Sequence, residues 1–458
     1  MEVAESVLNL IGKTPLLRLA RIGREVPPQI LAKLEYLNPG GSVKDRPAVT
    51  MVEAAEEQGK LRRGGTIVEP TSGNTGVGLA IVAARKKYRC IFVVPDKVSS
   101  EKISLLRAYG AEVVVCPTAL PPEHPESYYS VSDRLAREID GALKLDQYSN
   151  PANPLAHELS TGPEIWQQTA GRITHFVAGI GTAGTIVGVA RYLKAQNPEI
   201  KVIGADPLGS VYSGGSGRPY LVEGVGEDFF PANFDRSVID EVIPISDQES
   251  FLTARRLTQE EGVFTGGSSG LAVAAALQLG ERLRPTDVVV VLLPDSGRGY
   301  LSKLYDDTWL ADYGFIGARG LSATDVLNTK QSSYQALPQI VHVHPEETVR
   351  EVAATMREYA VSQVVVVSAE PPLVMGEVIG SASEEALLRE AFADAQILDQ
   401  PIGDHMGAVP PTIGTGESIA SIIQRLDGSG ALLVVDAGQP VGILTRSDLL
   451  EFLAHDSK

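Results

Sequence analysis

The pattern of apolar and polar positions divides the chain into a long first part and a shorter last part. Between residues 66 and 293, short β-branched runs alternate with stretches of about ten residues that have helical periodicity. This alternation is typical of a mostly parallel sheet covered by helices on both faces. Strands are predicted at 66–68, 90–94, 112–115, 174–178, 201–205 and 287–293, and helices at 47–58, 76–86, 101–109, 131–138, 156–169, 184–196, 249–260 and 270–283. We therefore expect an α/β unit with two lobes.

The last third of the chain has a different pattern. Residues 316–336 lose apolar periodicity and gain Ser, Thr, Gln and Asn, which predicts a linker with one helical turn. Two similar strand–helix–strand passages follow, at 341–367 and 411–435. Since one copy alone cannot bury its apolar face, we expect the two to pack as a pair. The predicted domains are 1–315, a linker at 316–336, and 337–458, the last made of 337–395 and 400–458.

Composition narrows the classes of protein that fit. The 458 residues carry a net charge of −17, which argues against a nucleic-acid partner, because such binding needs basic patches. Cys90 and Cys116 form no CxxC motif, so we expect a reduced, cytoplasmic setting without disulfides. The start of the chain does not read as a signal peptide, and no apolar run is long enough to span a membrane. We predict no metal site.

The heptapeptide Gly40-Gly41-Ser42-Val43-Lys44-Asp45-Arg46 stands where an extended run gives way to a helical pattern. A lysine at the start of a helix, near its partial positive charge and away from water, loses part of its preference for the ammonium form. A neutral amine is a nucleophile that forms Schiff bases with aldehydes. Lys44 is therefore a candidate to carry pyridoxal phosphate, and the alternative is a solvated lysine at a helix start.

Three further turns join a strand to a helix and favour an anion. Residues 179–184 match G-x-G-x-x-G, and Asp206 follows at the distance expected of a dinucleotide-binding fold. Backbone N–H groups at a helix start bind any phosphate, so this turn predicts a phosphate rather than a particular cofactor. The turn at 70–76 offers hydroxyl and N–H donors to a carboxylate, or is only a well-capped helix start. A third turn lies at 266–270.

Together these motifs resemble the tryptophan-synthase-like (fold type II) pyridoxal-phosphate enzymes. The motifs are G-G-S-V-K-D-R, T-S-G-N-T-G, G-I-G-T-A-G-T and G-G-S-S-G, in that order, and the match covers residues 6 to about 316. The cysteine synthase and cystathionine β-synthase branch is the most similar. By this resemblance Lys44 binds the cofactor covalently, Asn74 contacts its phenolic oxygen and Ser268 its pyridine nitrogen. The resemblance assigns the phosphate to Gly181, Thr182, Ala183, Gly184 and Thr185, and the substrate carboxylate to Thr71, Ser72, Thr75 and Gln147. Ala183 replaces the glycine usual in that loop.

The residue types suit β-replacement chemistry. A neutral serine at the pyridine nitrogen leaves the ring a weaker electron sink, which favours loss of a β-substituent over a long-lived carbanion. Residues 223–229 resemble the cystathionine β-synthase version of the branch, with Glu223 and Asp228 as acidic marks, although Glu227 stands where better-known members have Tyr. We expect serine and homocysteine to give cystathionine. Cysteine synthase activity with O-acetylserine and sulfide, and serine/threonine dehydratase activity, are the alternatives. Either Glu227 or Asp228 is expected to assist the hydroxide leaving group, unless the segment is only a solvated acidic loop.

The C-terminal pair resembles a tandem CBS (Bateman) module that binds adenosyl ligands. In the second copy G-I-L-T-R-S-D provides Thr445 and Asp448, which the resemblance assigns to ribose hydroxyls. The first copy lacks this aspartate, so one nucleotide site is expected rather than two. S-adenosylmethionine is the expected ligand, and a purely structural dimerisation module is the alternative. The resemblance further implies a homodimer or homotetramer, and no haem, because the catalytic match begins within ten residues of Met1.

Overall fold

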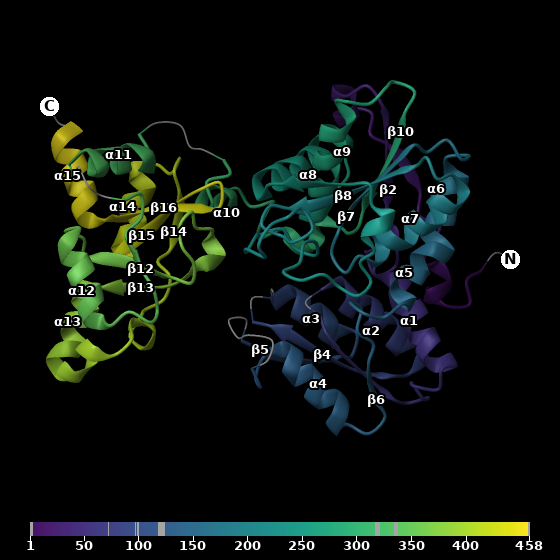
Figure 1. Ribbon diagram of the computed structural model, residues 1–458, viewed down its shortest axis with the longest axis horizontal. Helices are drawn as coiled ribbons and strands as arrows, with labels where there is room; N and C mark the ends of the chain where they lie inside the picture. The colour runs from purple at the N-terminus through teal and green to yellow at the C-terminus, as the bar shows by residue number, and fades with distance from the viewer. Residues whose placement is uncertain are drawn as a thin grey trace. The chain divides into compact units, whose positions relative to one another are not determined.

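A computed structural model describes residues 3–71, 73–96, 98, 100–117, 124–316, 321–333 and 338–456. The chain forms two compact units: Met1–Gly217 with Val222–Leu301, and Ser302–Lys458 with Arg218–Leu221. Each unit has its own sheets and helices (Figure 1). The domain boundaries at 315 and 336 stay predictions, and helix α10 (Asp307–Asp312) belongs to the second unit.

The first unit contains the predicted two-lobed α/β arrangement, with one sheet in each lobe. The larger sheet has six strands in the order β1 (Leu16–Arg18), β2 (Gln29–Leu34), β10 (Val288–Leu293), β7 (His175–Gly179), β8 (Lys201–Pro207) and β9 (Glu241–Ile245). The smaller has four strands in the order β5 (Glu112–Cys116), β4 (Arg89–Pro95), β3 (Thr66–Pro70) and β6 (Ala142–Lys144). Every pairing is parallel except that of β1 with β2.

Helices of five to fifteen residues connect the strands, where helices of about ten residues were predicted. They are α1 (Asp45–Glu57), α2 (Asn74–Lys86), α3 (Ser100–Ala108), α4 (Tyr128–Glu138), α5 (Ala152–Ala156), α6 (Gly162–Gln168), α7 (Gly184–Gln196), α8 (Asp247–Glu261) and α9 (Gly267–Gly280). A π-helical turn, His157–Thr161, joins α5 to α6 where one continuous helix was predicted. Such turns are often found at functional sites.

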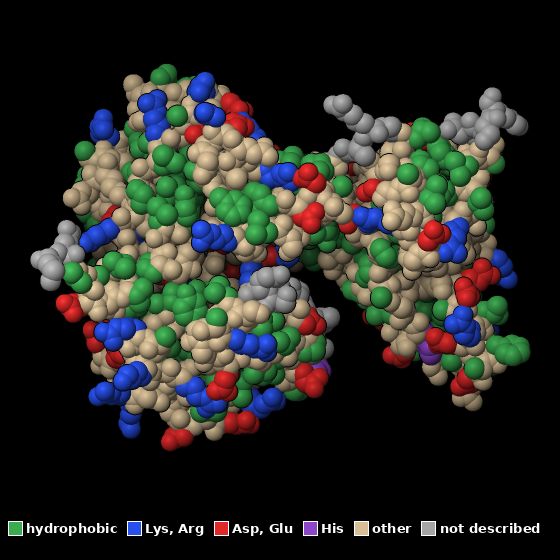
Figure 2. Space-filling view, turned by 180° about the vertical axis from the view of Figure 1, so that it is seen from behind, with side chains coloured by type: hydrophobic (Ala, Val, Ile, Leu, Met, Phe, Trp, Pro, Cys, Tyr) green, Lys and Arg blue, Asp and Glu red, His purple; other side chains and the backbone are tan. Residues whose placement is uncertain are grey.

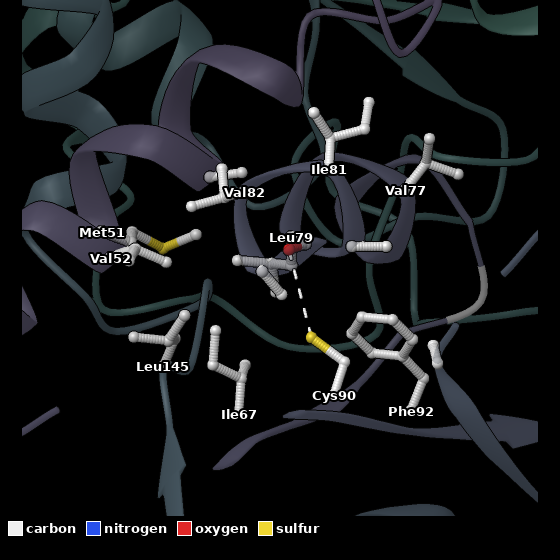
Figure 3. Packing of buried hydrophobic residues seen from close by; sticks show 14 of the residues in the cluster. Met51, Val52, Ile67, Val77, Leu79, Ile81, Val82, Cys90, Phe92 and Leu145 are labelled. Atoms are coloured by element: carbon white, nitrogen blue, oxygen red, sulfur yellow. Dashed lines mark hydrogen bonds between the residues drawn. The ribbon is translucent and has the colours of Figure 1, made fainter. Parts of the chain in front are cut away.

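The core of the smaller lobe shows why its strands are almost wholly apolar. Ile67 and Phe92 from the sheet pack against Leu79 and Val82 of α2, and all four are fully buried (Figure 3). Cys90 lies in the same cluster, with its Sγ 4.0 Å from the carbonyl oxygen of Leu79. A strand buried on both faces has no polar side to show, which explains runs rather than alternation in the sequence.

The second unit confirms the internal repeat. Strands β11 (His342–Val343), β12 (Gln363–Val367) and β13 (Val378–Ser383) form one sheet, and β14 (Thr412–Gly414), β15 (Ala431–Asp436) and β16 (Gln439–Thr445) form the other. In each sheet the first pair is parallel and the second antiparallel, with a register shift after Val366 in one and after Val434 in the other. By this register Ser383 corresponds to Thr445.

The helices of the second unit complete the two copies. They are α11 (Ala323–Ser333), α12 (Val349–Glu358), α13 (Glu384–Ala393), α14 (Ile419–Gly428) and α15 (Arg446–Asp456), besides α10. One apolar cluster takes Val365 and Val367 from the first copy and Leu433 and Val435 from the second, so the copies share a core as expected. Helix α11 is longer than the single turn predicted there, because Ala323, Val326 and Leu327 pack in the core of the second copy.

On the face shown in Figure 2, Lys and Arg side chains lie scattered among Asp and Glu rather than gathered in one patch. Within the described residues, no helix has both the length and the apolar character that crossing a bilayer requires.

Candidate active site and nucleotide pocket

Lys44 lies at the N-terminus of α1, beside the carboxyl end of β10 in the larger sheet. The N–H of Val43 donates to the carbonyl oxygen of Pro294 at 2.8 Å, and Ser42 forms a bridge with Asp295, so the heptapeptide is tied to the end of β10. The Ser42 hydroxyl accepts from the N–H of Lys44 at 3.2 Å. These contacts fix the backbone that carries the lysine.

Two glycines allow close approaches around Lys44. The N–H of Gly40 donates to Asp45 Oδ2 at 2.5 Å, and a Cβ at residue 40 would collide with the other oxygen of the same carboxylate. On the facing helix α2, a Cβ at Gly78 would lie 2.9 Å from the carbonyl oxygen of Lys44. Helices α1 and α2 therefore touch at backbone distance beside the candidate lysine, and only glycine permits this.

The surroundings of Lys44 favour its neutral amine. Burial lowers the pKa of Lys44, while the carboxylates of Asp295 and Glu227 act in the opposite direction. Among the described residues, none hydrogen-bonds to its Nζ. A partly desolvated amine without a fixed partner is suited to covalent and acid–base chemistry.

Asp295 is a site residue that the sequence reasoning missed. Its Oδ2 accepts from Asn74 Nδ2 at 2.8 Å and from the Tyr300 hydroxyl at 2.7 Å, whereas its buried Oδ1 has no partner among the described residues. Burial raises the pKa of Asp295. The sequence held one signal for it: Asp295 directly follows a buried parallel strand, and the carboxyl ends of such strands are where ligands bind in open α/β sheets.

The turn at 179–185 has the shape of a phosphate cradle. Residues 184 onward form α7, and Ala183 caps it in the left-handed region with φ 64°. The Tyr212 hydroxyl donates to the carbonyl oxygen of Gly181 at 2.7 Å. A residue in this conformation followed by a helix directs successive N–H groups to one point, where an anion is stabilised.

The hydroxyls of this turn are held by polar residues behind it. Asn153 Nδ2 donates to Thr182 Oγ1 at 3.1 Å, and a Cβ at Gly184 would collide with the same amide. Thr185 Oγ1 lies 3.2 Å from Nε2 of His157. Burial lowers the pKa of His157 well below its usual value, so the ring is neutral and orients the hydroxyl without adding charge.

Asp206 plays no part that a dinucleotide fold would give it. Its side chain is fully buried, and its Oδ2 accepts from the N–H of Ser213 at 2.8 Å. Its Oδ1 has no partner among the described residues, but a fully buried carboxylate is not available to a ribose.

The proposed substrate residues lie next to the phosphate turn. Thr75 Oγ1 donates to Gln147 Oε1 at 2.7 Å, and Asn153 Nδ2 donates to the carbonyl oxygen of Gln147 at 2.8 Å. Asn153 therefore links the Gln147 loop to Thr182. Thr71 is buried at the end of β3, with its N–H bonded to Val93, and Ser72 lies outside the described residues.

A buried carboxylate supports the Gln147 loop from below. Glu69 accepts backbone N–H groups of Leu145, Asp146 and Gln147 at 3.0–3.1 Å. Burial raises the pKa of Glu69 to about 7, against the effect of these donors. The loop is thus positioned by a group that the sequence motifs did not include.

Ser268 lies in the first turn of α9 and is buried. The turn before it is fixed by Thr265, whose hydroxyl contacts Ser269 and donates to the carbonyl oxygen of Asp295 at 2.9 Å. Asn74, at the start of α2, is bonded to the same aspartate. Asp295 thus joins the ends of two helices that carry candidate cofactor ligands.

The three acidic residues of the segment after β8 have different surroundings. Glu223 forms an ion pair with Lys102 of α3, whose ammonium lies 4.9 Å from the ring centre of Tyr300. Asp228 is exposed. Burial raises the pKa of Glu227 to about 8, and Asp228 acts in the same direction while Lys44 and a hydrogen bond with Tyr148 oppose it. Of the two expected leaving-group acids, Glu227 is the half-buried one, and its charge interacts with that of Lys44.

These features fit a phosphorylated aldehyde. The amine of Lys44 is poised for a covalent bond, the turn 181–185 can hold a phosphate, and the buried Asp295 Oδ1 leaves an unmatched acceptor nearby. Asn74 and Ser268 supply neutral polar groups for the rest of the ring system. The residues present therefore suit pyridoxal phosphate.

A cavity of about 800 Å³ lies in the second unit between its two copies. Thr445 and Asp448 are in its wall, with Lys330 and Arg357 among the other polar groups. Asp448 Oδ2 accepts from the N–H and the hydroxyl of Thr445, both at 2.7 Å, and from Lys330 Nζ at 3.1 Å. Among the described residues, none donates to Oδ1. In the first copy, the Ser383 hydroxyl caps α13 by accepting from the N–H of Ala386. By the strand register, Ala386 occupies the position that corresponds to Asp448.

Comparison with known proteins agrees with both units. The family described as pyridoxal-phosphate dependent enzyme matches residues 7–295, and the CBS domain matches 334–392 and 402–455. A cystathionine beta-synthase of Dictyostelium discoideum is 36% identical over 98% of this chain and 92% of its own length. The cystathionine beta-synthase of Apis mellifera is 46% identical over 69% of this chain, and the match spans 64% of that protein.

A solved structure resembles the first part of the chain. The O-acetylserine dependent cystathionine beta-synthase from Helicobacter pylori superposes with a TM-score of 0.63 at 41% identity, and the match covers 66% of this chain and 99% of that one.

Proposed function

Since the chain belongs to the pyridoxal-phosphate dependent enzymes, and within them to the cystathionine β-synthase family, we propose that it condenses L-serine with L-homocysteine to L-cystathionine. The observation that carries the choice of serine is the half-buried carboxyl of Glu227, whose charge interacts with that of Lys44. Hydroxide is a poor leaving group and needs a proton, and an acid with a pKa of about 8 still holds one at neutral pH.

The chain's own residues divide the work. When bound, pyridoxal phosphate supplies an electron sink for the electron pair left on Cα. Lys44 binds the cofactor, takes the proton from Cα of serine and returns it there after the thiol has added. Thr71, Ser72, Thr75 and Gln147 bind the carboxylate of the substrate, and the turn 181–185 binds the phosphate. Asn74 and Ser268 orient the ring.

Paired substrates test the role of Glu227. Acetate leaves without a proton, so E227Q is expected to slow turnover of serine about a hundredfold while leaving that of O-acetylserine, with homocysteine in both assays, nearly unchanged. In the wild type, serine turnover falls as pH rises through about 8, whereas O-acetylserine turnover keeps its rate there. D228N removes the exposed neighbouring carboxylate, which raises the pKa of Glu227, so it is expected to move the fall in serine turnover to lower pH rather than to remove the proton donor. Equal loss with both substrates would remove the argument for serine.

O-acetylserine remains the second candidate donor. The Helicobacter pylori structure, 41% identical to this chain, is described as O-acetylserine dependent. Initial rates with serine or O-acetylserine as donor and homocysteine or sulfide as acceptor separate cystathionine synthesis from cysteine synthesis. Pyruvate or 2-oxobutyrate formed without a thiol would reveal dehydratase activity.

We further propose that the cavity beside Asp448 binds an adenosyl ligand, with S-adenosylmethionine first among the candidates. The free Oδ1 of Asp448 offers an acceptor to a ribose hydroxyl, and a cavity of about 800 Å³ is within the usual range for such ligands. Lys330 and Arg357 provide positive charge that also suits a nucleotide phosphate. The first copy has Ala386 in the corresponding place, which supports one site.

Calorimetric titration of the full-length, cofactor-loaded chain with S-adenosylmethionine, ATP and AMP tests this site. D448N is expected to weaken the preferred ligand about ten- to hundredfold, the usual effect of losing a hydrogen bond to a charged group. Asp394 also caps a helical turn but lies outside the cavity, so D394N serves as the control. Equal affinities in both variants would assign the module a structural role.

Compartment and assembly belong to the same proposal. Both cysteines are free and buried, which suits a reduced, cytoplasmic setting. The exposed side chains of Leu155 in α5 and Leu159 in the π-helical turn lie four residues apart and suit a homodimer or homotetramer contact. Light scattering of the wild type and of a variant carrying L155K and L159K tests this assembly.

A further inference from the structure

One group of side chains in the second unit belongs neither to the active site nor to the nucleotide cavity. His342 and His344 lie on β11, and Glu370 lies in the connection between β12 and β13. Among the described residues this is the one set of three His, Cys, Asp or Glu side chains close enough to share a metal ion. The sequence predicted no metal site, and a His-x-His pair indicates one only together with a third ligand.

The strand geometry brings the two imidazoles together. Residues two apart on a strand point to the same face, while Val341 and Val343 point into the core of the first copy. β11 is the edge strand of its sheet, so the histidine side chains remain 23% and 30% exposed. The two rings stand perpendicular with centroids 5.6 Å apart.

The distances suit a tetrahedral ion after small adjustments. Ligand atoms about 2.0 Å from one Zn²⁺ lie about 3.3 Å from each other in a tetrahedron. Here His344 Nε2 is 3.3 Å and His342 Nε2 is 3.8 Å from the Glu370 carboxylate, and the three ligand atoms all lie within 4.8 Å of one another. The Glu370 side chain is 79% exposed and free to rotate. Nδ1 of His342 faces the carbonyl oxygen of Ile340 at 3.4 Å, which leaves Nε2 as the coordinating atom.

We propose that His342, His344 and Glu370 bind a divalent transition-metal ion, with Zn²⁺ as the best fit. Two imidazoles and one carboxylate are borderline ligands that select Zn²⁺, Co²⁺, Ni²⁺ or Cu²⁺ over Mg²⁺ or Ca²⁺. Three protein ligands leave a fourth position to water or to another ligand. The ion fastens the edge strand β11 to the β12–β13 connection.

The test uses the tag-free, full-length, cofactor-loaded chain, treated with chelator and then titrated with ZnCl₂ by calorimetry. One ion per chain is expected, and H342Q, H344Q and E370Q are each expected to weaken binding at least about tenfold. H405Q is the matched control: His405 also faces a carboxylate, Glu390 at 2.8 Å, but has no second imidazole partner. A rise in melting temperature with Zn²⁺ in the wild type and in H405Q, absent from H344Q, is the second expected readout.

Two results would overturn the proposal. One is the absence of saturable Zn²⁺ binding in the wild type, in which case the three residues form only an ion pair of protonated histidine with Glu370. The other is equal affinity in the wild type and in H342Q or H344Q, which would place the ion elsewhere. Circular dichroism of the metal-free variants checks that they fold, since all three side chains are partly exposed.

Discussion

Two lysines of the first unit, the fully buried Lys33 and the half-buried Lys44, share a lowered pKa but differ in their partners. Burial is the main cause of the shift in both. Lys33 Nζ donates to the carbonyl oxygen of Thr14, to Glu164 and to Gln168, at 2.6, 2.7 and 3.0 Å. Lys44 has no such bonds within the described part of the chain. One lysine is fixed, and the other is kept available.

The fixed lysine is part of a network that supports the available one. Arg46 makes two hydrogen bonds to Glu35 and two to Glu164, all at 2.8 Å, two residues after Lys44. The region of Lys33 therefore satisfies its charges, whereas the region of Lys44 contains an unpaired Asp295 Oδ1 and a left-handed Ala183. Unsatisfied groups and backbone strain concentrate where function requires them.

The largest expected effect separates the two lysines directly. K44A removes the covalent anchor and the acid–base group together, so steady-state turnover is expected to fall about 10⁴-fold or more with little change in unfolding free energy. K33M is expected to do the reverse: the folded enzyme turns over, but it unfolds at lower urea. Borohydride reduction followed by peptide mapping should place the pyridoxyl label on Lys44 in the wild type and in K33M. A label on another residue would break the comparison.

The next effect concerns the network itself. E164Q leaves Lys33 and part of Arg46 buried without a carboxylate, and breaking a buried ion pair costs about 3–5 kcal/mol. Urea unfolding followed by circular dichroism measures this loss. Retention of wild-type stability would mean that the network only positions residues.

A pH titration sharpens the same point. Hydrogen bonds and charges from Arg46 and Lys33 outweigh burial and lower the pKa of Glu164 to about 2. Because the folded pKa lies below the unfolded one, this stabilisation is complete above about pH 4.5 and is lost as pH falls through about 2. The gap in unfolding free energy between wild type and E164Q should shrink by about 2 kcal/mol from pH 6 to pH 3. A constant gap would contradict the assignment.

The smallest effect lies in the phosphate turn. Ala183 has φ 64°, a conformation that costs a non-glycine residue about 1–2 kcal/mol, part of which glycine gives back in the unfolded state. A183G is therefore expected to raise the unfolding free energy by about 0.5–1 kcal/mol. Thermal unfolding of the full chain measures it. A neutral or destabilising result would show that the strain has been relieved by neighbouring contacts.

The sequence was sufficient to predict the helices and strands of the fold and the glycine-rich turns of the active site. Strands buried on both faces and glycine-rich turns leave local signals, which explains why Gly181–Thr185 and the repeated copies were found. The left-handed backbone of Ala183 was not foreseen, because alanine itself gives no sign of it.

The residues that support the active-site loops could not be predicted from the sequence, for a different reason. Asp295, Glu69 and Asn153 act through partners 29 to 221 residues away, where no local pattern exists. Helix α11 was underestimated because its apolar residues, spaced three or four apart, are few and become meaningful only against the core of the second copy. Hydrogen bonds between residues far apart in the chain are set by the fold and leave no pattern in a short stretch of sequence.

The ion pair between Lys330 and Asp448 Oδ2 competes with any ligand that would bind the same oxygen in the cavity of the second unit. Both side chains are nearly buried, at 12% and 10% exposure, so added salt screens their attraction only weakly. Any ligand that needs the oxygen held by Lys330 binds with its intrinsic dissociation constant divided by the fraction of molecules in which the ammonium has swung away. For the proposed adenosyl ligand, this ion pair raises the concentration needed to engage Oδ2, whereas Oδ1 requires no such displacement.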